Sequence, residues 1–128
     1  PKGKITCATN MDQIGSTLEP VHEGIKDYLI ILGENTLKKE DRGKIGLCNR
    51  FYNIHLDIDY TFYSSEAFTT LYYKLSDQVA FQEAEIPALL LTSGFHSHTY
   101  KISDDIDLIS YPTLKKRTVL VFYFVMML

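Results

Sequence analysis

The sequence predicts an α/β sandwich, in which helices cover a central sheet. Two observations predict this fold. Strand-like segments alternate with helix-like segments, and no internal repeat or Pro/Gly-rich linker interrupts them. The clearest strand is a continuous apolar run, Ile86–Leu91 (IPALLL), which is typical of strands that are buried on both faces.

Four segments are expected to be strands. Three of them are mostly apolar, whereas the segment Leu56–Tyr60 alternates apolar with acidic residues. Such alternation suits a strand with one wet face, so this segment is expected at an edge of the sheet. The four expected strands are Ile5–Met11, Asp27–Leu32, Leu56–Phe62 and Ala88–Leu91.

Two helices are expected between the strands. Asn35 is a suitable N-cap for a helix that reaches about Tyr52, because its side chain accepts hydrogen bonds from free backbone N–H groups. Gly43 and Gly46 weaken this helix by about 1 kcal/mol each relative to Ala. A shorter helix is expected over Ser76–Ala84.

A third helix is expected at the end of the chain. Ser110 is a suitable N-cap, and Pro112 fits the first turn, where its missing N–H costs nothing. The second part of this helix, Val119–Leu128, is apolar on every side, so it is expected to be covered on more than one face. The longest apolar stretch, Thr118–Leu128, is well short of the roughly 18 residues that a membrane span requires.

Composition limits the classes of function. The chain has 128 residues, 45% hydrophobic residues and a formal net charge of −3. It is therefore expected to be one domain or part of one, without the basic surface of a nucleic-acid-binding protein. Cys7 and Cys48 form no CxxC pair, so neither a disulfide framework nor a thiolate zinc site is expected. Dinucleotide, P-loop and serine-hydrolase functions lack their sequence motifs.

Side chains that can bind metals follow two of the expected strands. Asp12 follows the first strand, and His96 and His98 follow the last one. Imidazole suits zinc, copper, iron or nickel, and an aspartate at the carboxyl end of a strand can be a ligand. Asp12 could instead be a turn residue, and the two histidines could be separate surface residues. His22 and His55 are expected to face solvent.

Other polar and aromatic groups have two interpretations each. Asp104, Asp105 and Asp107 precede the last helix, whose positive N-terminal end favours acids. Asp77 could cap the short helix or lie in a pocket. An aromatic cluster could form a lid over the sheet or the wall of a substrate cleft; its members are Tyr60, Phe62, Tyr63, Phe68, Tyr72 and Tyr73.

Four segments, in order, resemble motifs of the co-catalytic zinc exopeptidases, the family of bacterial leucyl aminopeptidase, aminopeptidase Y, glutamate carboxypeptidase and glutaminyl cyclase. Asn10–Gly15 (NMDQIG) is similar to N-[ML]-D-M-[IV]-G, and Ser76–Phe81 (SDQVAF) is similar to S-D-H-x-x-F. Ile86–His96 is similar to an I-P-x strand that ends in G-x-H. Tyr100–Tyr111 is similar to Y-H-x-P-x-D-T-x-D-x-I-[ND]-[YF], and the helix from Leu114 resembles the family's closing helix.

This resemblance implies a three-layer sandwich with a mainly parallel central sheet, of which residues 1–128 would be a C-terminal, partial domain. In the family, the aspartate that matches Asp12 and the histidine of Y-H-x-P bind different zinc ions, and a metal-activated water attacks the peptide carbonyl. The metal ligands expected here are Asp12 and His98. The substrate-binding residues expected here are Asp77, Gln78, His96 and Tyr100.

The sequence departs from the family pattern in three places. The ligand histidine falls on Tyr100, whose reference pKa of about 10 disfavours a coordinating phenolate, so His98 would have to substitute. The histidine of S-D-H falls on Gln78. The family's upstream half, with its H-x-D motif, bridging aspartate and Glu-Glu pair, has no counterpart here, and the initial Pro1 also suggests a segment of a longer polypeptide.

The resulting hypothesis is the C-terminal portion of a zinc-dependent, aminopeptidase-like metallopeptidase that hydrolyses N-terminal residues from peptides and is incomplete or inactive alone. The alternatives are a catalytically degenerate homologue that acts as a binding module, and an unrelated α/β domain. Expected partners are a peptide and a second copy bound through an exposed sheet edge, with no nucleic acid and no membrane span. The parent is expected to be periplasmic or secreted, and Asp12 should meet the His96–Tyr100 loop at one crevice.

Overall fold

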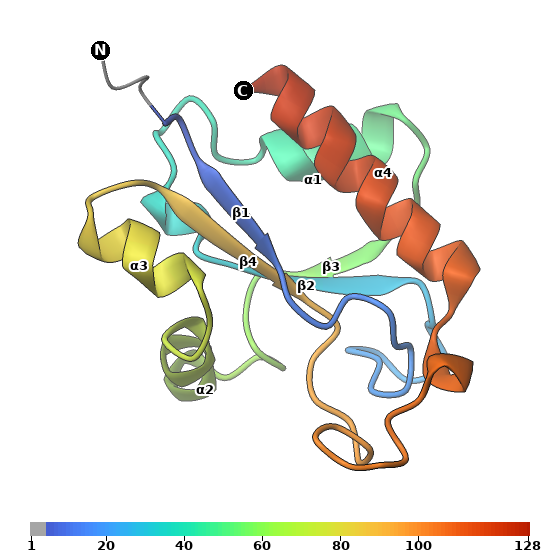
Figure 1. Cartoon of the computed structure of the whole chain (residues 1–128). Helices are drawn as coiled ribbons and strands as arrows, with labels where there is room; N and C mark the ends of the chain where they lie inside the picture. The colour runs from blue at the N-terminus through green and yellow to red at the C-terminus, as the bar shows by residue number, and fades with distance from the viewer. Residues whose placement is uncertain (1–4) are drawn as a thin grey trace.

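The core of the protein is a four-stranded mixed sheet (Figure 1). The computed structural model describes residues 5–128. The order across the sheet is β1-β4-β2-β3; β1 pairs parallel with β4, β2 pairs parallel with β3, and β2 pairs antiparallel with β4. Two of the three pairings are therefore parallel, which agrees with the predicted fold class. The strands are β1 Ala8–Met11, β2 Tyr28–Leu32, β3 Asp57–Asp59 and β4 Ala88–Thr92.

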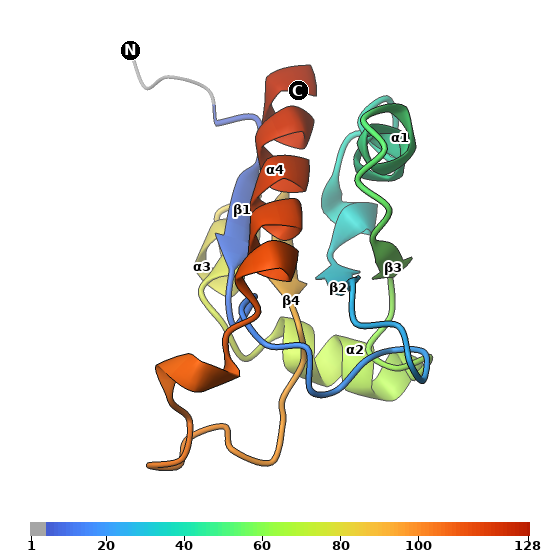
Figure 2. The ribbon, with the colours of Figure 1, turned by 90° about the vertical axis from the view of Figure 1, so that its right-hand side faces the viewer.

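Helices cover both faces of the sheet and make a three-layer sandwich (Figures 1 and 2). One face carries α1 (Lys44–Phe51) and α4 (Tyr111–Met127), and the other carries α2 (Glu66–Tyr73) and α3 (Gln78–Glu83). Successive residues of a strand point to opposite faces, so the strands divide their side chains between two cores. One core includes Leu29, Ile31, Leu89, Leu91, Leu120 and Phe124, and the other includes Ile30, Leu32, Phe62, Tyr73 and Leu90.

The two central strands match their sequence predictions closely. Every residue of β2 and β4 is buried, because both faces are covered and both edges are paired. The prediction that the alternating segment lies at an edge is also confirmed, since β3 pairs with β2 alone. This strand is shorter than predicted because the Asp59 carboxylate accepts hydrogen bonds from the Thr61 N–H and hydroxyl, which turn the chain away from the sheet.

The predicted helix from Asn35 is wrong in its first half. Asn35 lies in a short 3-10 turn, Glu34–Thr36, and α1 begins only at Lys44. Gly43 precedes it with a φ of 79°, a left-handed conformation that glycine adopts without steric cost. The glycine that was expected to weaken one long helix therefore marks the start of a short one.

Helix α2 is an element that the local patterns did not predict; Phe68, Tyr72 and Tyr73 of the aromatic cluster lie on it. Ser65 precedes it, and the Ser65 hydroxyl accepts a hydrogen bond from the Phe68 N–H. The next helix, α3, lies within the predicted range. Asp77 occupies its N-cap position, but the carboxylate makes no capping hydrogen bond.

The prediction of the last helix is confirmed at its start, with Ser110 in the N-cap position and Pro112 in the first turn. Its apolar end is covered on one side only. Phe124 is fully buried against the sheet, whereas Phe122 and Met126 are 60% and 71% exposed. In residues 5–128, no helix is both long and apolar enough to cross a bilayer.

Candidate functional site

The carboxyl ends of β1 and β4 meet at one end of the sheet. The strands run in parallel with Met11 opposite Leu91, and the Asp12 N–H extends the pairing by donating to the Leu91 carbonyl oxygen at 3.0 Å. Asp12 and Tyr100 both line a cavity of ≈ 250 Å³ beside this junction. The first strand end and the loop after β4 thus share a crevice, as the sequence predicted.

A chain of polar side chains orients Asp12. The Ser76 hydroxyl donates to Asp12 Oδ2 at 2.6 Å, and Asn10 Nδ2 donates to Ser76 Oγ at 2.8 Å and to Gln78 Oε1 at 3.0 Å. Gln78 is fully buried, and its Nε2 donates to the Tyr73 carbonyl oxygen. The carboxylate is therefore held by a network that is rooted in the protein interior.

A buried arginine anchors the segment that follows Asp12. Arg117 of α4 donates from Nη1 to the carbonyl oxygens of Ile14 and Ser16, at 2.6 and 2.8 Å. Its Nε donates to the Tyr28 carbonyl oxygen at 2.8 Å, and its guanidinium lies 4.9 Å from the centroid of the Tyr28 ring. No local pattern in the sequence shows which backbone carbonyls Arg117 meets, because they lie in segments far from it in the chain.

Aromatic rings form one wall of the cavity. Phe62 stacks on Tyr72 at 3.9 Å between ring centroids, Tyr72 lies 5.2 Å from Phe95, and Phe95 lies 6.2 Å from Tyr100. All four residues line the cavity with Asp12. Phe62 is buried in the core, whereas the Tyr100 residue is 88% exposed, so the cluster covers the sheet and also walls the cavity.

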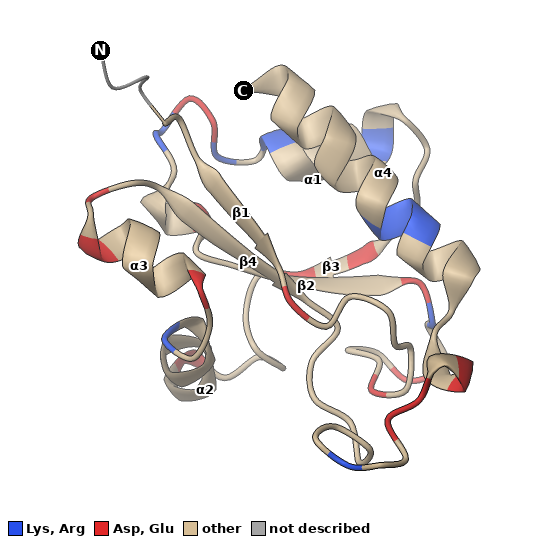
Figure 3. Ribbon diagram, viewed as in Figure 1, with Lys and Arg blue, Asp and Glu red and all other residues tan. Residues whose placement is uncertain are grey.

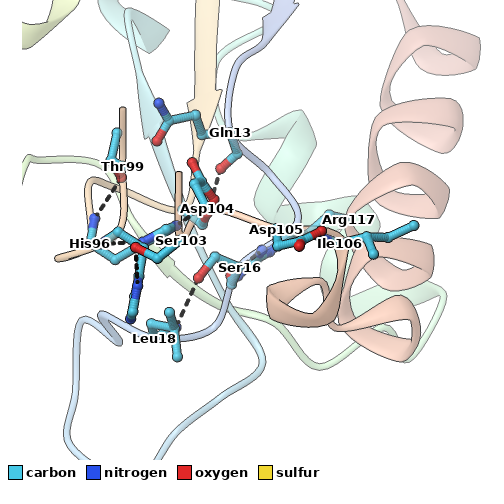
Figure 4. A network of polar contacts seen from close by, with 12 residues as sticks. Gln13, Ser16, Leu18, His96, Thr99, Ser103, Asp104, Asp105, Ile106 and Arg117 are labelled. Atoms are coloured by element: carbon cyan, nitrogen blue, oxygen red, sulfur yellow. Dashed lines mark hydrogen bonds and ion pairs between the residues drawn. The ribbon is translucent and has the colours of Figure 1, made fainter. Parts of the chain in front are cut away.

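The two loop histidines have different partners; Figure 4 shows His96 with its neighbours Thr99, Ser103 and Asp104. His96 has a nearly buried side chain, and its Nε2 lies 3.8 Å from Asp104 Oδ1. Its Nδ1 accepts a hydrogen bond from the His98 N–H. The His98 ring instead has its Nδ1 2.9 Å from Ser103 Oγ. Each of the two rings therefore has a polar partner of its own.

His96 faces a second cavity, of ≈ 230 Å³, which Gln13, Ser16, Asp104 and Asp105 also line. Figure 3 shows acidic residues just after β1 and in the segment before α4. The Asp105 carboxylate is engaged with the backbone, since Oδ1 accepts from the Ile106 N–H at 2.6 Å. It caps the short 3-10 turn Ile106–Leu108 rather than the start of α4.

The remaining expected site residues lie away from the Asp12 cavity. Asp77 lines a separate cavity of ≈ 330 Å³ with residues of β1, and Gln78 is enclosed in the interior. His22 is exposed, as expected; its Nδ1 lies 2.6 Å from Asp57 Oδ2, and this hydrogen bond raises the pKa of His22. Of the four residues expected to bind substrate, Tyr100 alone shares the cavity with Asp12.

These donors do not fit a zinc centre. Structural and catalytic zinc sites use three or four protein ligands. Within the described part of the chain, no group of three or more His, Cys, Asp or Glu side chains could hold a metal ion. Asp12 and His98, the two expected ligands, do not line a common cavity. The position that carries the ligand histidine in the resembled motif holds the exposed phenol of Tyr100.

Comparison with solved structures places this fold beside bacterial aminopeptidases. The LapA aminopeptidase of Legionella pneumophila superimposes with a TM-score of 0.68 and 16% identity, over 94% of this chain and 30% of that chain. BSAP, a zinc aminopeptidase from Bacillus subtilis, gives 0.64 and 17%, over 93% and 27% respectively. The fold resembles part of a zinc aminopeptidase.

The likeness is one of fold, since the identity is low. No family model matches the sequence, and no curated protein matches it either. The chain spans less than a third of the length of these solved aminopeptidases.

Proposed function

We propose that residues 1–128 are the C-terminal part of an aminopeptidase-like protein and supply one wall of its peptide-binding cleft. The observation that carries this proposal is the position of Asp12 and Tyr100 in one cavity at the carboxyl ends of β1 and β4. Ligands of open α/β sheets bind in such crevices. The aromatic wall provides the apolar surface on which a peptide side chain packs.

By itself, this part of the protein does not hydrolyse peptides. In the complete protein, the zinc ions and the general base would be held mainly by the upstream half, because the His, Cys, Asp and Glu side chains of residues 5–128 do not make a zinc site. Asp12 would be the contribution of this chain to such a centre, where a carboxylate ligand helps to fix the metal that activates water.

The first test combines zinc titration with binding and activity. Isothermal titration should show no tight, stoichiometric zinc uptake, and an aminoacyl-p-nitroanilide substrate should not be hydrolysed. Titration of ¹⁵N-labelled protein with the tripeptide Phe-Gly-Gly should shift the amide resonances of Asp12, Tyr72, Phe95 and Tyr100. Zinc-dependent turnover by the chain alone, or shifts confined to another surface, would contradict the proposal.

A second candidate function is a non-catalytic relative that keeps the fold as a binding module. Two substitutions favour it: Tyr100 stands where the resembled motif has a ligand histidine, and Gln78 stands where it has another histidine. Gln78 has moreover become part of the buried network behind Asp12. The complete gene product distinguishes the two functions, because an enzyme would show zinc-dependent aminopeptidase activity and a binding module would show peptide binding without turnover.

A further inference from the structure

The two helical layers of the sandwich differ in the sign of their charged residues. Helices α1 and α4 contain basic residues and, as Figure 3 shows, no Asp or Glu, whereas α2 and α3 contain acidic residues and no Lys or Arg. We propose that the exposed surface of α1 and α4 (the α1/α4 face) binds the exposed surface of α2 and α3 (the α2/α3 face) of a second copy. The basic residues are Lys44, Arg50, Lys115, Lys116 and the buried Arg117, and the acidic residues are Glu66 and Glu83.

Both faces also expose apolar side chains. On the α1/α4 face, Phe51, Phe122 and Met126 each have more than half of their surface exposed. On the α2/α3 face, the same holds for Phe68 and Leu71. Exposed apolar surface that is bordered by charged groups marks interaction sites of proteins, so each face has the composition of a docking surface.

Aromatic rings join α1 to α4 in one continuous surface. The Tyr52 ring, directly after α1, stacks on the Tyr123 ring of α4 with 3.6 Å between centroids. Phe51 and Phe122 extend this pair, with centroids 5.0 Å from Tyr52 and 5.6 Å from Tyr123 respectively. Because these contacts form within one chain, the surface is in place before a partner arrives, which lowers the entropy cost of binding.

A hollow beside these rings provides a place for an acidic side chain. It has a volume of ≈ 350 Å³, and its lining includes Tyr52, Val119, Lys115 and Lys116. Lys116 pairs with Asp27, whereas Lys115 is exposed and makes no ion pair with any of residues 5–128. An available ammonium next to apolar walls attracts a carboxylate that brings apolar contacts with it.

The α2/α3 face supplies such carboxylates. Glu66 and Glu83 are exposed, and neither takes part in an ion pair within the described part of the chain. Lys74 follows α2 directly, but Glu85 lies just beyond α3, so this face remains acidic. A second copy therefore offers apolar and acidic groups together. An anionic bilayer is the less favoured partner, because the chain has a net charge of −3.

The positions of the two faces determine the kind of assembly. They lie on opposite sides of the sheet (Figure 1). A contact between two different faces leaves one face free on each outer copy, so further copies can add head to tail unless the rotation closes a ring. A symmetric dimer through the α1/α4 face alone would instead bring two basic surfaces together, which repulsion between like charges disfavours.

The first test blocks one face at a time. Phe122→Glu places a charge in the α1/α4 face, and Leu71→Glu places one in the α2/α3 face. Each should weaken self-association, measured by sedimentation equilibrium, by about tenfold or more, because the new charge loses water in an apolar contact. Ile102→Glu, in the exposed loop before α4, is the matched control and should associate as the wild type does. Circular dichroism of each variant verifies the fold.

The second test mixes the two blocked variants. Each variant keeps the face that the other one lacks, so an equimolar mixture should form a heterodimer and no larger species. Each variant alone should be monomeric at the same concentration. A fluorescent label on one variant follows the heterodimer in sedimentation velocity. A mixture that remains monomeric would contradict the pairing of the two faces.

A third measurement tests the charges. Lys115→Gln should weaken association by about two- to fivefold, the effect of removing one surface ion pair. Added NaCl should weaken association of the wild type, because salt screens exposed charges. Lys101→Gln removes the same charge from an exposed loop and should have no effect.

Three further outcomes would overturn this inference. A wild-type chain that stays monomeric at every concentration has no such contact. Association of Leu71→Glu at wild-type strength would mean that the α2/α3 face is not used. Binding of a monomeric chain to phosphatidylglycerol vesicles would assign the α1/α4 face to a lipid surface. None of the substituted residues lines the Asp12 cavity, so peptide-induced shifts there test the proposed function separately.

Discussion

At the scale of single residues, Arg117 has a large structural role that its neighbours in the sequence do not indicate. It is fully buried, and it joins α4 to the segment that follows Asp12 and to the start of β2. Burial lowers the pKa of Arg117, while the Tyr28 ring and Asp27 favour its charged form. Its partners are carbonyl oxygens, so its removal leaves several buried acceptors without a donor.

Replacement of Arg117 by Met should therefore destabilise the protein strongly. We expect the free energy of unfolding to fall by about 3 kcal/mol or more, because the three hydrogen bonds that the buried guanidinium donates to carbonyl oxygens are lost together. Urea denaturation measures the change. Lys115→Met, at an exposed position of the same helix, should change it by less than about 0.5 kcal/mol. A loss below about 1 kcal/mol in Arg117→Met would mean that the guanidinium is dispensable.

At the scale of elements, α2 shows how a helix can depend on one capping side chain. It has eight residues, which is too short for a stable isolated helix. Its support comes from Tyr73 in the core and from the Ser65 cap. Because α2 carries Tyr72 into the cavity wall, the cap also contributes to the shape of the candidate site.

Ser65→Ala should lower the free energy of unfolding by about 1 kcal/mol, since the Phe68 N–H loses its acceptor. Ser65→Gly should cost less, a few tenths of a kcal/mol, because glycine is itself tolerated at this position. Thermal or urea denaturation measures both changes. Ser97→Ala, in an exposed loop, is the matched control and should be neutral. Equal stability of Ser65→Ala and wild type would show that the cap is not needed.

At the scale of the whole molecule, an apolar face of α4 and one edge of the sheet are exposed to solvent. Phe122, Val125 and Met126 lie on the exposed face of α4, with exposed fractions of 60%, 49% and 71%. Strand β1 lies at one edge of the sheet and pairs on one side, with β4. Exposed apolar patches and unpaired strand edges both promote association.

The isolated chain should therefore associate as its concentration rises. Sedimentation velocity measured over a range of concentrations should show species larger than the monomer. Phe122→Glu should shift the distribution toward the monomer, because it places a charge in the apolar patch, whereas Gln82→Glu on α3 should not. A single monomeric species at all concentrations would show that these surfaces do not interact.

Local patterns in the sequence determined much of the framework. The apolar runs of β2 and β4 predicted buried strands, since strands that are covered on both faces tolerate few polar side chains. Ser110 and Pro112 marked the start of α4, because the first turn of a helix has free N–H groups whichever partners it meets. Motif order placed Asp12 and the loop after β4 at one end of the sheet, and their common cavity confirms that part.

The tertiary structure decided which side chains meet. The sequence did not predict the antiparallel pairing of β2 with β4, the enclosure of Gln78 or the different partners of His96 and His98. Each of these depends on contacts between segments that lie far apart in the chain or on the exact path of a loop, and local patterns do not contain them. Local patterns determined where β2, β4 and α4 form, because those choices follow from neighbouring residues, whereas they missed α2 and the late start of α1. Folding determined the site, because a site is a set of distances between elements.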